Sequence, residues 1–548
     1  ANTTADNNVA IGDSTLTSNT TGTSNVAVGR EALKNNTTAN NNTAFGHEAL
    51  KANTTGTQNT AVGALAGDAC TTGNNLTAIG YAAGSAVTTG SENTLVGRDA
   101  GSAIQGGGSN TFIGHRSGDA TTSASNNTGV GMPSLGANTT GADNTAVGAF
   151  SLDANTTASY NNAFGYNTLT ANTTGAYNSG FGHAVLQSNT TANNNTGMGY
   201  LALSGNTTGS ENIAIGNYTL DANVGGANNT AVGYNALSSN TSADFNVGIG
   251  RQALLSNTTG AENTAVGTNS LDACTTGTNN VAVGRGALSA MTAPSNNTAL
   301  GDTALFTCTT GANNTACGKG SLFNLTTANN NTALGNASLA NCTTGAGNVA
   351  IGEVSGSDAV FNVTTESNRL VLGHNAITNA YVKVSLTVTS DQRDKTDIVN
   401  IGSDKGLSFV EKLRPVSFYY NESRDKPDVK TGFKRYGFLA QEVLALEGSD
   451  NVIINNEDTN NLKYQGEALV PVLVKAVQEL SAKVAELEVI NAVIAGSQMA
   501  DEDASSRQSC VDRNVEHLEL MKAKTDWGSE DMTATTKAIS DGKAYKAS

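Results

Sequence analysis

The chain has 548 residues, a formal net charge of −16, and 61 glycines against 5 prolines. Residues 1–389 hold 10 Lys and Arg against 19 Asp and Glu, whereas residues 390–548 hold 20 against 27. Both parts are acidic, which argues against a nucleic-acid backbone or an anionic membrane surface as partner. No apolar run reaches the length of about 18 residues that a membrane span needs, so we expect no membrane insertion.

The six cysteines form no CxxC pair, and four of them replace the same asparagine of a sequence repeat. They indicate neither a disulfide framework nor a metal site, and we expect no metal and no cofactor. The segment Asn2-Thr3-Thr4 matches later repeat units, so the sequence begins inside a repeat. We therefore expect it to be a fragment of a longer chain.

Residues 1–352 form an array with a period of 17. Glycine recurs at every seventeenth position from Gly12 to Gly352, an apolar residue always precedes it, and leucine usually follows four residues later. Such self-similarity marks a repeat architecture, and the Gly, Asn and Thr content disfavours helix. We predict a mostly β solenoid of short strands turned by Gly and Asn, with Asn and Thr stacked in ladders.

The apolar residue before each glycine is predicted to point into a narrow core. One Val and one Leu per coil would bury little surface, which favours several chains that share a core. Within residues 63–118 the repeat leucine becomes glycine, at Gly67, Gly84, Gly101 and Gly118. We expect a thinner core or an altered coil there.

Two stripes of side chains run along the array. The position after the repeat glycine often carries aromatic or basic residues, which favour interfaces. It predicts a receptor or glycan contact line with Tyr166, Tyr200, Tyr234 and Arg251 as candidates, the alternatives being a solvated face or packing between subunits. The Asn-Thr-Thr turn forms the second stripe; its threonines could bind ice, although turn chemistry alone explains them.

Residues 353–389 form a transition, in which apolar and polar residues alternate over 382–388 as in a strand. Residues 390–468 predict a small α+β domain with a short helix at 406–413, a strand at 415–421 and a strand-to-helix turn at 436–443. Residues 469–496 predict a coiled-coil helix, and residues 497–548 a polar tail. The helix carries apolar steps of four and three at Leu473, Val477, Leu480, Val484, Leu487, Asn491 and Ile494.

Two resemblances add to this reading. The segments 8–12 and 348–352 resemble the head repeats of trimeric autotransporter adhesins, although the period here is longer. Residues 390–490 resemble the C-terminal intramolecular chaperone auto-processing domain of phage tail fibres and tailspikes, best known from endosialidases. The matching pieces are Ser390-Asp391-x-x-x-Lys395 and the segments 413–418, 437–443 and 476–480. The first resemblance implies a trimeric β-roll, whereas the Val and Leu positions of the helix alone favour two strands.

The second resemblance implies that the domain assembles three chains, drives folding of the repeats and then cleaves itself off between Thr389 and Ser390. It makes Ser390 the nucleophile and Lys395 its base, with Asp391 and Glu442 as candidates to position the lysine. A serine hydroxyl needs such a base, and an amine serves only in its neutral form, which burial on assembly would favour. The alternative is a capped turn with an exposed lysine.

We therefore predict a phage-type tail fibre: a self-cleaving homotrimer that binds a host-surface receptor or glycan. It would fold in the host cytoplasm and act on the virion, outside the cell. A cellular trimeric surface adhesin and an ice-binding β-solenoid are the alternatives. A glycan-cleaving tailspike is disfavoured, because acidic residues are scattered singly in the array and form no catalytic pair.

Overall fold

The computed structural model of the chain divides into two units, residues 1–377 and 378–548. It describes residues 4–377, 380–381, 390, 392–423, 426–456, 459 and 462–498, together with 509, 512–513, 515–516, 519 and 540. The strand predicted at 382–388, Thr389 and Asp391 lie outside the described residues.

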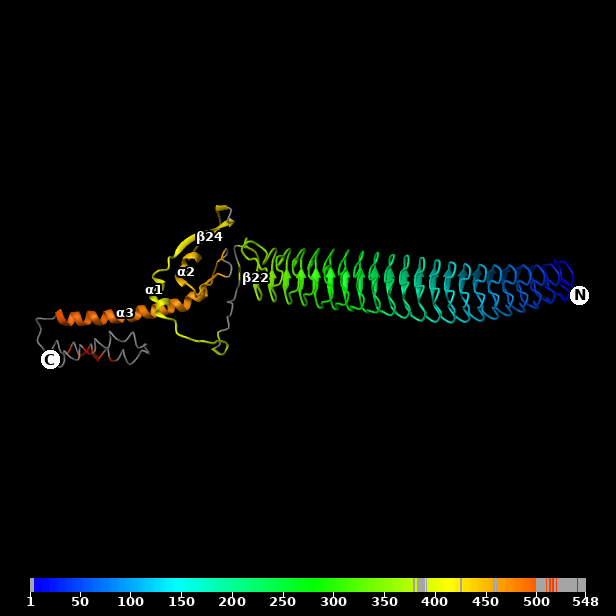
Figure 1. The fold of residues 1–548 in the computed structure, drawn as a ribbon. Helices are drawn as coiled ribbons and strands as arrows, with labels where there is room; N and C mark the ends of the chain where they lie inside the picture. Colours follow the sequence, from blue (N-terminus) through cyan, green and yellow to red (C-terminus); the bar gives the residue numbers. More distant parts are fainter. Residues whose placement is uncertain are drawn as a thin grey trace. The chain divides into compact units, whose positions relative to one another are not determined.

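The first unit is a solenoid in which each 17-residue repeat makes one coil (Figure 1). Every coil contributes a three-residue strand that pairs in parallel with the strand of the next coil; β1 (Val9–Ile11) pairs in this way with β2 (Val26–Val28). The strands form one 22-stranded sheet, which confirms the predicted mostly β solenoid.

The remaining strands of this sheet follow one per coil. They are β3 (Thr43–Phe45), β4 (Thr60–Val62), β5 (Thr77–Ile79), β6 (Thr94–Val96), β7 (Thr111–Ile113), β8 (Thr128–Val130), β9 (Thr145–Val147), β10 (Asn162–Phe164), β11 (Ser179–Phe181), β12 (Thr196–Met198), β13 (Ile213–Ile215), β14 (Thr230–Val232), β15 (Val247–Ile249), β16 (Thr264–Val266), β17 (Val281–Val283), β18 (Thr298–Leu300), β19 (Thr315–Cys317), β20 (Thr332–Leu334), β21 (Val349–Ile351) and β22 (Leu370–Leu372).

Two columns of buried asparagines connect successive coils, as the predicted ladders require. In one column the Asn161 amide donates to the Gly175 carbonyl at 2.9 Å, and its Oδ1 accepts the backbone N–H of Asn178 at 3.0 Å. In the other, Nδ2 of Asn172 donates to Oδ1 of Asn155 at 3.0 Å. Stacking therefore satisfies polar groups that burial would otherwise leave unpaired.

The central residue of each strand points into the core, and the residue before the glycine points out. In β10, Ala163 is 0% exposed whereas Phe164 is 36% exposed. The predicted direction of the apolar residue is therefore wrong. The core consists mainly of strand alanines and of leucines such as Leu169, which are fully buried in a single chain. One chain therefore fills this interior by itself, since the interior is narrow enough for alanine and leucine to fill, and the small burial per coil is no argument for a core shared between chains.

The glycines that replace leucine within residues 63–118 do not thin the core, which corrects a second expectation. A Cβ at Gly118 would lie 2.5 Å from the ring of Phe112, and one at Gly84 would lie 2.6 Å from Leu95. Phe112 and Leu95 occupy the strand centre, where other coils have alanine, and both are buried. The large side chain thus lies at the strand centre and not at the usual leucine position, so the interior stays filled.

The solenoid continues beyond the predicted end of the array at residue 352. The strand β22 pairs in parallel with β21 after a step of 21 residues, from Val349 to Leu370, instead of 17. The longer coil contains an isolated bridge between Ser357 and Asn362. Within it, the Asp358 carboxylate accepts two backbone N–H groups at 2.7 Å.

The second unit is a small α+β region that leads into a long helix, as predicted. Its strands form two antiparallel hairpins, β23 with β24 and β25 with β26. The elements are η1 (Gln392–Asp394), η2 (Ser403–Lys405), α1 (Leu407–Val410), β23 (Val416–Ser423), β24 (Lys426–Gly437), α2 (Ala440–Glu447), β25 (Ile454–Asn455), β26 (Lys463–Tyr464), η3 (Gly466–Ala468) and α3 (Leu469–Gln498).

This unit buries few large side chains. Its core cluster comprises Phe409, Val443, Ile453, Ile454, Leu469 and Val472. On the β23–β24 hairpin, by contrast, Phe433 is 72% exposed and Tyr436 is 85% exposed. Among the helices that the structure describes, none combines the length and the apolar character needed to cross a bilayer.

Candidate active site

A short helical turn brings Ser390 and Lys395 together. The turn η1 lies between them, and the backbone N–H of Lys395 donates to the Gln392 carbonyl at 3.2 Å. The Lys395 Nζ then lies 2.7 Å from the Ser390 Oγ and 3.3 Å from the Ser390 carbonyl oxygen. An amine at this distance can take the hydroxyl proton once the amine is neutral.

Both residues of this pair are exposed in the single chain. Removal from water disfavours a charged amine, so burial is the change that would turn Lys395 from a donor into a base. The contact therefore exists in the single chain, whereas the burial that the chemistry requires does not.

The other predicted residues of the site are only partly described. Thr389 and Asp391 lie outside the described residues, so their roles stay predictions. Glu442 lies on α2, where Nε of Arg414 donates to its Oε2 at 3.0 Å and Nη2 of Arg414 contacts Oε1. The guanidinium lowers the pKa of the Glu442 carboxyl. The contacts of the described residues thus join Glu442 to Arg414 and include none with Lys395.

Two further carboxylates hold this unit together, and the sequence reading missed both. Glu447 is buried, and its side chain accepts the backbone N–H groups of Val452, Ile453 and Ile454 at 2.5 to 2.9 Å. Such a carboxylate organises the loop before β25. The only sequence signal is the turn that begins at Gly448 directly after it.

The second carboxylate, Glu479, extends from α3 to the start of α1. Its Oε2 accepts the Leu407 N–H at 2.7 Å. A Cβ at Gly406 would lie 2.3 Å from both carboxylate oxygens, so a larger residue there would displace the Glu479 side chain from this position. The contact joins residues 72 positions apart, which no local pattern reveals.

The helix α3 has one covered face and one open face. Leu469, Val472 and Ala476 are buried within the unit. The predicted seam faces away from this core, and its side chains are about half exposed; they are Leu473, Val477, Leu480, Val484 and Leu487. Asn491 is also exposed, and the side chain of Ile494 lies outside the described part. An open heptad seam on a folded unit is a surface for another helix.

The candidate contact residues of the solenoid lie close together. Tyr166, Tyr200 and Tyr234 are exposed, and His183 and Tyr218 join them into a continuous run of rings. Tyr166 stacks on His183 at 5.4 Å, and His183 stacks on Tyr200 at 5.1 Å. These stacked faces are closed to a ligand, which would meet ring edges and hydroxyls. Arg251 follows one coil beyond Tyr234 and is exposed.

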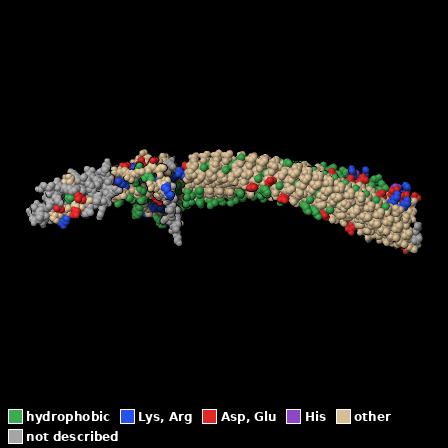
Figure 2. Space-filling view, turned by 90° about the horizontal axis from the view of Figure 1, so that it is seen from below, with side chains coloured by type: hydrophobic (Ala, Val, Ile, Leu, Met, Phe, Trp, Pro, Cys, Tyr) green, Lys and Arg blue, Asp and Glu red, His purple; other side chains and the backbone are tan. Residues whose placement is uncertain are grey.

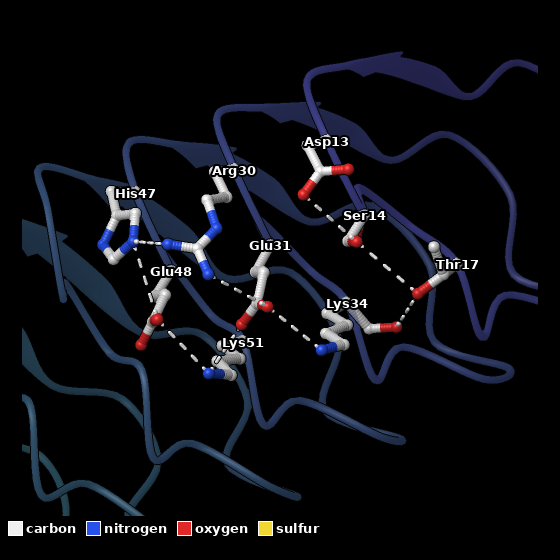
Figure 3. A network of polar contacts seen from close by, with 9 residues as sticks. All are labelled: Asp13, Ser14, Thr17, Arg30, Glu31, Lys34, His47, Glu48 and Lys51. Atoms are coloured by element: carbon white, nitrogen blue, oxygen red, sulfur yellow. Dashed lines mark hydrogen bonds and ion pairs between the residues drawn. The ribbon is translucent and has the colours of Figure 1, made fainter.

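Near the N-terminus the same face carries a network of charges (Figure 3). The Nζ of Lys51 lies 2.6 Å from Glu31 Oε2, and the Nζ of Lys34 lies 3.1 Å from Glu31 Oε1. The hydrogen bonds from Lys51 and Lys34 lower the pKa of Glu31 to about 2. Glu48 in turn contacts Lys51 at 3.3 Å. The charges pair with one another and form no patch of a single sign.

The threonine columns of the Asn-Thr-Thr turns are not equivalent. The first threonine of a turn donates its hydroxyl to the next coil, as Thr156 does to the Thr173 carbonyl at 3.1 Å. The second, such as Thr157, is exposed. The hydroxyls of the first threonine column therefore donate to groups within the solenoid. Across the described residues there is no group of three or more His, Cys, Asp or Glu side chains that could hold a metal ion.

Comparison with known proteins gives one match. Residues 390–452 match the family described as chaperone of endosialidase, whose members are autoproteolytic chaperone domains. The segment contains the Ser390–Lys395 contact and the Arg414–Glu442 ion pair. No curated protein and no solved structure matches the chain.

Proposed function

We propose that residues 390–548 bring three chains together, and that each chain then cuts itself between Thr389 and Ser390. The observation that carries this proposal is the 2.7 Å contact between Lys395 Nζ and Ser390 Oγ. It lies inside the segment that matches the endosialidase chaperones. The same pair in an unrelated loop would be a turn with an exposed lysine.

The chemistry uses the groups of the site itself. The Ser390 hydroxyl attacks the carbonyl carbon of Thr389 while neutral Lys395 takes the hydroxyl proton. The bond from that carbonyl to the Ser390 nitrogen breaks, the nitrogen receives the proton, and an ester joins Thr389 to the Ser390 oxygen. Water then hydrolyses the ester. The products are a shaft that ends in a carboxylate at Thr389 and a released domain that begins at Ser390.

Assembly supplies the burial that the lysine needs. The open seam of α3 is the surface through which three helices would pack, because side chains such as Leu480 and Val484 are exposed in the single chain. Packing of the three units removes water from Ser390 and Lys395 and favours the neutral amine. Cleavage then follows assembly and does not precede it.

The solenoid is the product of this process. We infer that it acts as the shaft of a phage-type tail fibre, folded in the host cytoplasm and carried on the virion to a receptor or glycan outside the cell. The exposed ring run from Tyr166 to Tyr234 is the proposed contact line, with Arg251 at one end. Ring edges and hydroxyls are the groups that it offers.

Intact-mass measurement of the expressed full chain tests the cleavage. Cutting before Ser390 releases a fragment of 159 residues (548 − 389). We expect Ser390→Ala and Lys395→Ala to abolish it, and Ser408→Ala and Lys412→Ala, exposed or partly exposed residues of the same types, to leave it unchanged. Persistent cleavage in Ser390→Ala would refute the proposed nucleophile.

A further inference from the structure

The solenoid sheet has one covered face and one open face. The strand centre points inward, and the third residue of every strand, the residue before the repeat glycine or its counterpart in β22, points outward. We name this outward column the outer stripe. All 22 of its residues, one for each strand, are apolar or cysteine, and none is charged. Figure 2 shows hydrophobic side chains gathered along the lower edge of the solenoid towards its C-terminal end, while most of the visible surface is of other types.

The outer stripe is more exposed than an apolar column of a finished sheet would be. Away from the two end strands, Phe45 is 56% exposed, Met198 46% and Leu334 46%. Parallel sheets occur almost only with both faces covered, and a long exposed apolar patch marks a site of protein contact. The open face of this sheet therefore needs an occupant.

A second copy of the chain is the occupant that fits. The stripe repeats once per 17-residue coil through the whole array, so a partner must present apolar groups at the same spacing over the same length. A second copy of this sheet, aligned in parallel, has the same coils and therefore presents apolar side chains at the same spacing. The open seam of α3 independently calls for identical helices side by side.

We propose that the copies meet along the outer stripe, so that the shaft is held by a dry apolar seam and not only by its C-terminal unit. This inference rests on the proposed three-chain assembly. The repeat glycine separates the outer stripe from the neighbouring face that carries Tyr166 and the charge network. A contact between copies on that face would bury paired charges such as Glu31 and Lys51. The desolvation free energy of a buried ion pair exceeds its electrostatic attraction unless every polar group of the pair is hydrogen-bonded. The ring run thus stays open to a ligand.

Cys317 provides a native probe, because it is the residue that β19 contributes to the outer stripe. It is partly exposed, whereas Cys70, Cys274, Cys308 and Cys342 are buried. Burial raises the pKa of Cys70, Cys274 and Cys308 to about 11, so these thiols stay neutral and unreactive at neutral pH. Cys510, which lies outside the described residues, is removed by Cys510→Ser.

The test treats the full chain carrying Cys510→Ser with a maleimide and follows the labelled fraction by intact mass. We expect Cys317 to react slowly in the assembled shaft, because the seam covers it, and rapidly after denaturation. The matched control moves the thiol to the exposed Thr310 of the same repeat, by Thr310→Cys in a Cys317→Ser background. It should react rapidly in both states.

A second pair of variants tests the stripe without chemistry. Phe164 and Tyr166 are exposed aromatic residues of one coil, and each stacks on a residue of the next coil. Phe164→Asp should lower the melting temperature of the assembled shaft, whereas Tyr166→Asp should leave it close to that of the parent chain. Equal shifts in the two variants would contradict a seam along the outer stripe.

Light scattering on the same full-length samples separates the two proposals. A three-chain assembly in which Cys317 is protected from the maleimide supports both. A three-chain assembly in which Cys317 reacts as rapidly as the thiol of Thr310→Cys overturns the outer stripe as the seam and leaves the proposed function standing. A single-chain mass overturns the proposed assembly itself, and the seam with it.

Discussion

The two units of the chain differ in how they complete a core. In the solenoid, strand alanines and repeat leucines are fully buried within one chain, and asparagine columns bond one coil to the next. In the C-terminal unit the buried cluster is small, while a hairpin and one face of α3 leave large apolar groups in water. The repeats thus complete their interior within one chain, whereas the C-terminal unit leaves apolar side chains exposed, and our proposal covers them with other chains.

This difference separates folding from assembly. A coil of the solenoid depends on its sequence neighbours, so its stability comes from contacts about 17 residues apart. The C-terminal unit, under the proposed function, depends on contacts with other chains. The proposal therefore assigns assembly to the C-terminal unit and the lasting structure to the solenoid.

The largest expected effect comes from the close packing of successive coils at the repeat glycines. Gly182 has φ +134°, and a Cβ there would lie 2.0 Å from the Gly199 carbonyl oxygen. We expect Gly182→Ala to destabilise the shaft by about 4 kcal/mol or more, because both strain and a backbone clash oppose it. Thermal melting followed by circular dichroism measures the change. In Gly320→Ala, where φ is +62° and no atom lies within 4 Å, we expect a cost of only about 1 kcal/mol.

The asparagine columns give the next largest effect. Asn161→Ala would leave the buried Asn178 N–H without its acceptor, while the Gly175 carbonyl would keep its bond from Asn172 Nδ2; we expect a cost of about 1–3 kcal/mol. Asn217 makes the same kind of bond, to the Tyr200 N–H at 2.9 Å, but it is exposed. Water can replace it, so Asn217→Ala should cost less than about 1 kcal/mol. Hydrogen exchange of the neighbouring amides reports both; equal protection losses would contradict a buried ladder.

The seam of α3 tests whether the C-terminal unit assembles chains. Leu480→Ala removes an exposed side chain, so it should leave the fold of the single chain intact. It should weaken assembly by about 2 kcal/mol per chain, the value of burying a leucine. Sedimentation equilibrium of the Ser390→Ala chain, which keeps the unit attached, measures the dissociation constant. Val474 is exposed beside the seam and provides the control: Val474→Ala should have little effect on that constant.

The smallest expected effect is the acid response of the N-terminal charge network. Lys51 and Lys34 hold the pKa of Glu31 at about 2, below the ordinary value of 4.5. A lowered folded pKa contributes stability above about pH 4.5, and this contribution is lost as the pH falls from 4.5 towards 2. Burial raises the pKa of Asp153 and Asp221, which act in the opposite direction. The melting temperature of Glu31→Gln should therefore vary less than that of the parent chain over this range, and identical profiles would refute the role of Glu31.

The 17-residue period and the repeated Asn predict the coil spacing and the ladders, but not the last coil, in which the step from Val349 to Leu370 is 21 residues. The sequence does not determine which side of a three-residue strand faces inward. In the triplet Asn162-Ala163-Phe164 the larger apolar residue was expected inside, yet the interior accepts only Ala163. The exchange of volume between Gly118 and Phe112 is likewise readable only once the coils are stacked.

At the candidate site, the sequence indicates contacts between residues a few positions apart, but not contacts between residues far apart in the chain. Ser390 and Lys395 are five positions apart, and one helical turn brings them into contact; their catalytic roles stay predictions. Arg414 lies 28 positions before Glu442, and Glu479 lies 72 positions after Leu407, so no local pattern joins either pair. Glu442 was therefore assigned to the lysine that its sequence context suggested, while its contact in the structure is an arginine.

The most direct test of the account compares residues 1–389 made in two ways. Released from the full chain by cleavage, this shaft should be a three-chain assembly. Expressed alone, without residues 390–548, it should show the β-type circular dichroism of the solenoid but the mass of a single chain, or aggregate through its open outer stripe. If the shaft expressed alone forms the same assembly with the same melting temperature, the C-terminal unit is not the chaperone that the account requires.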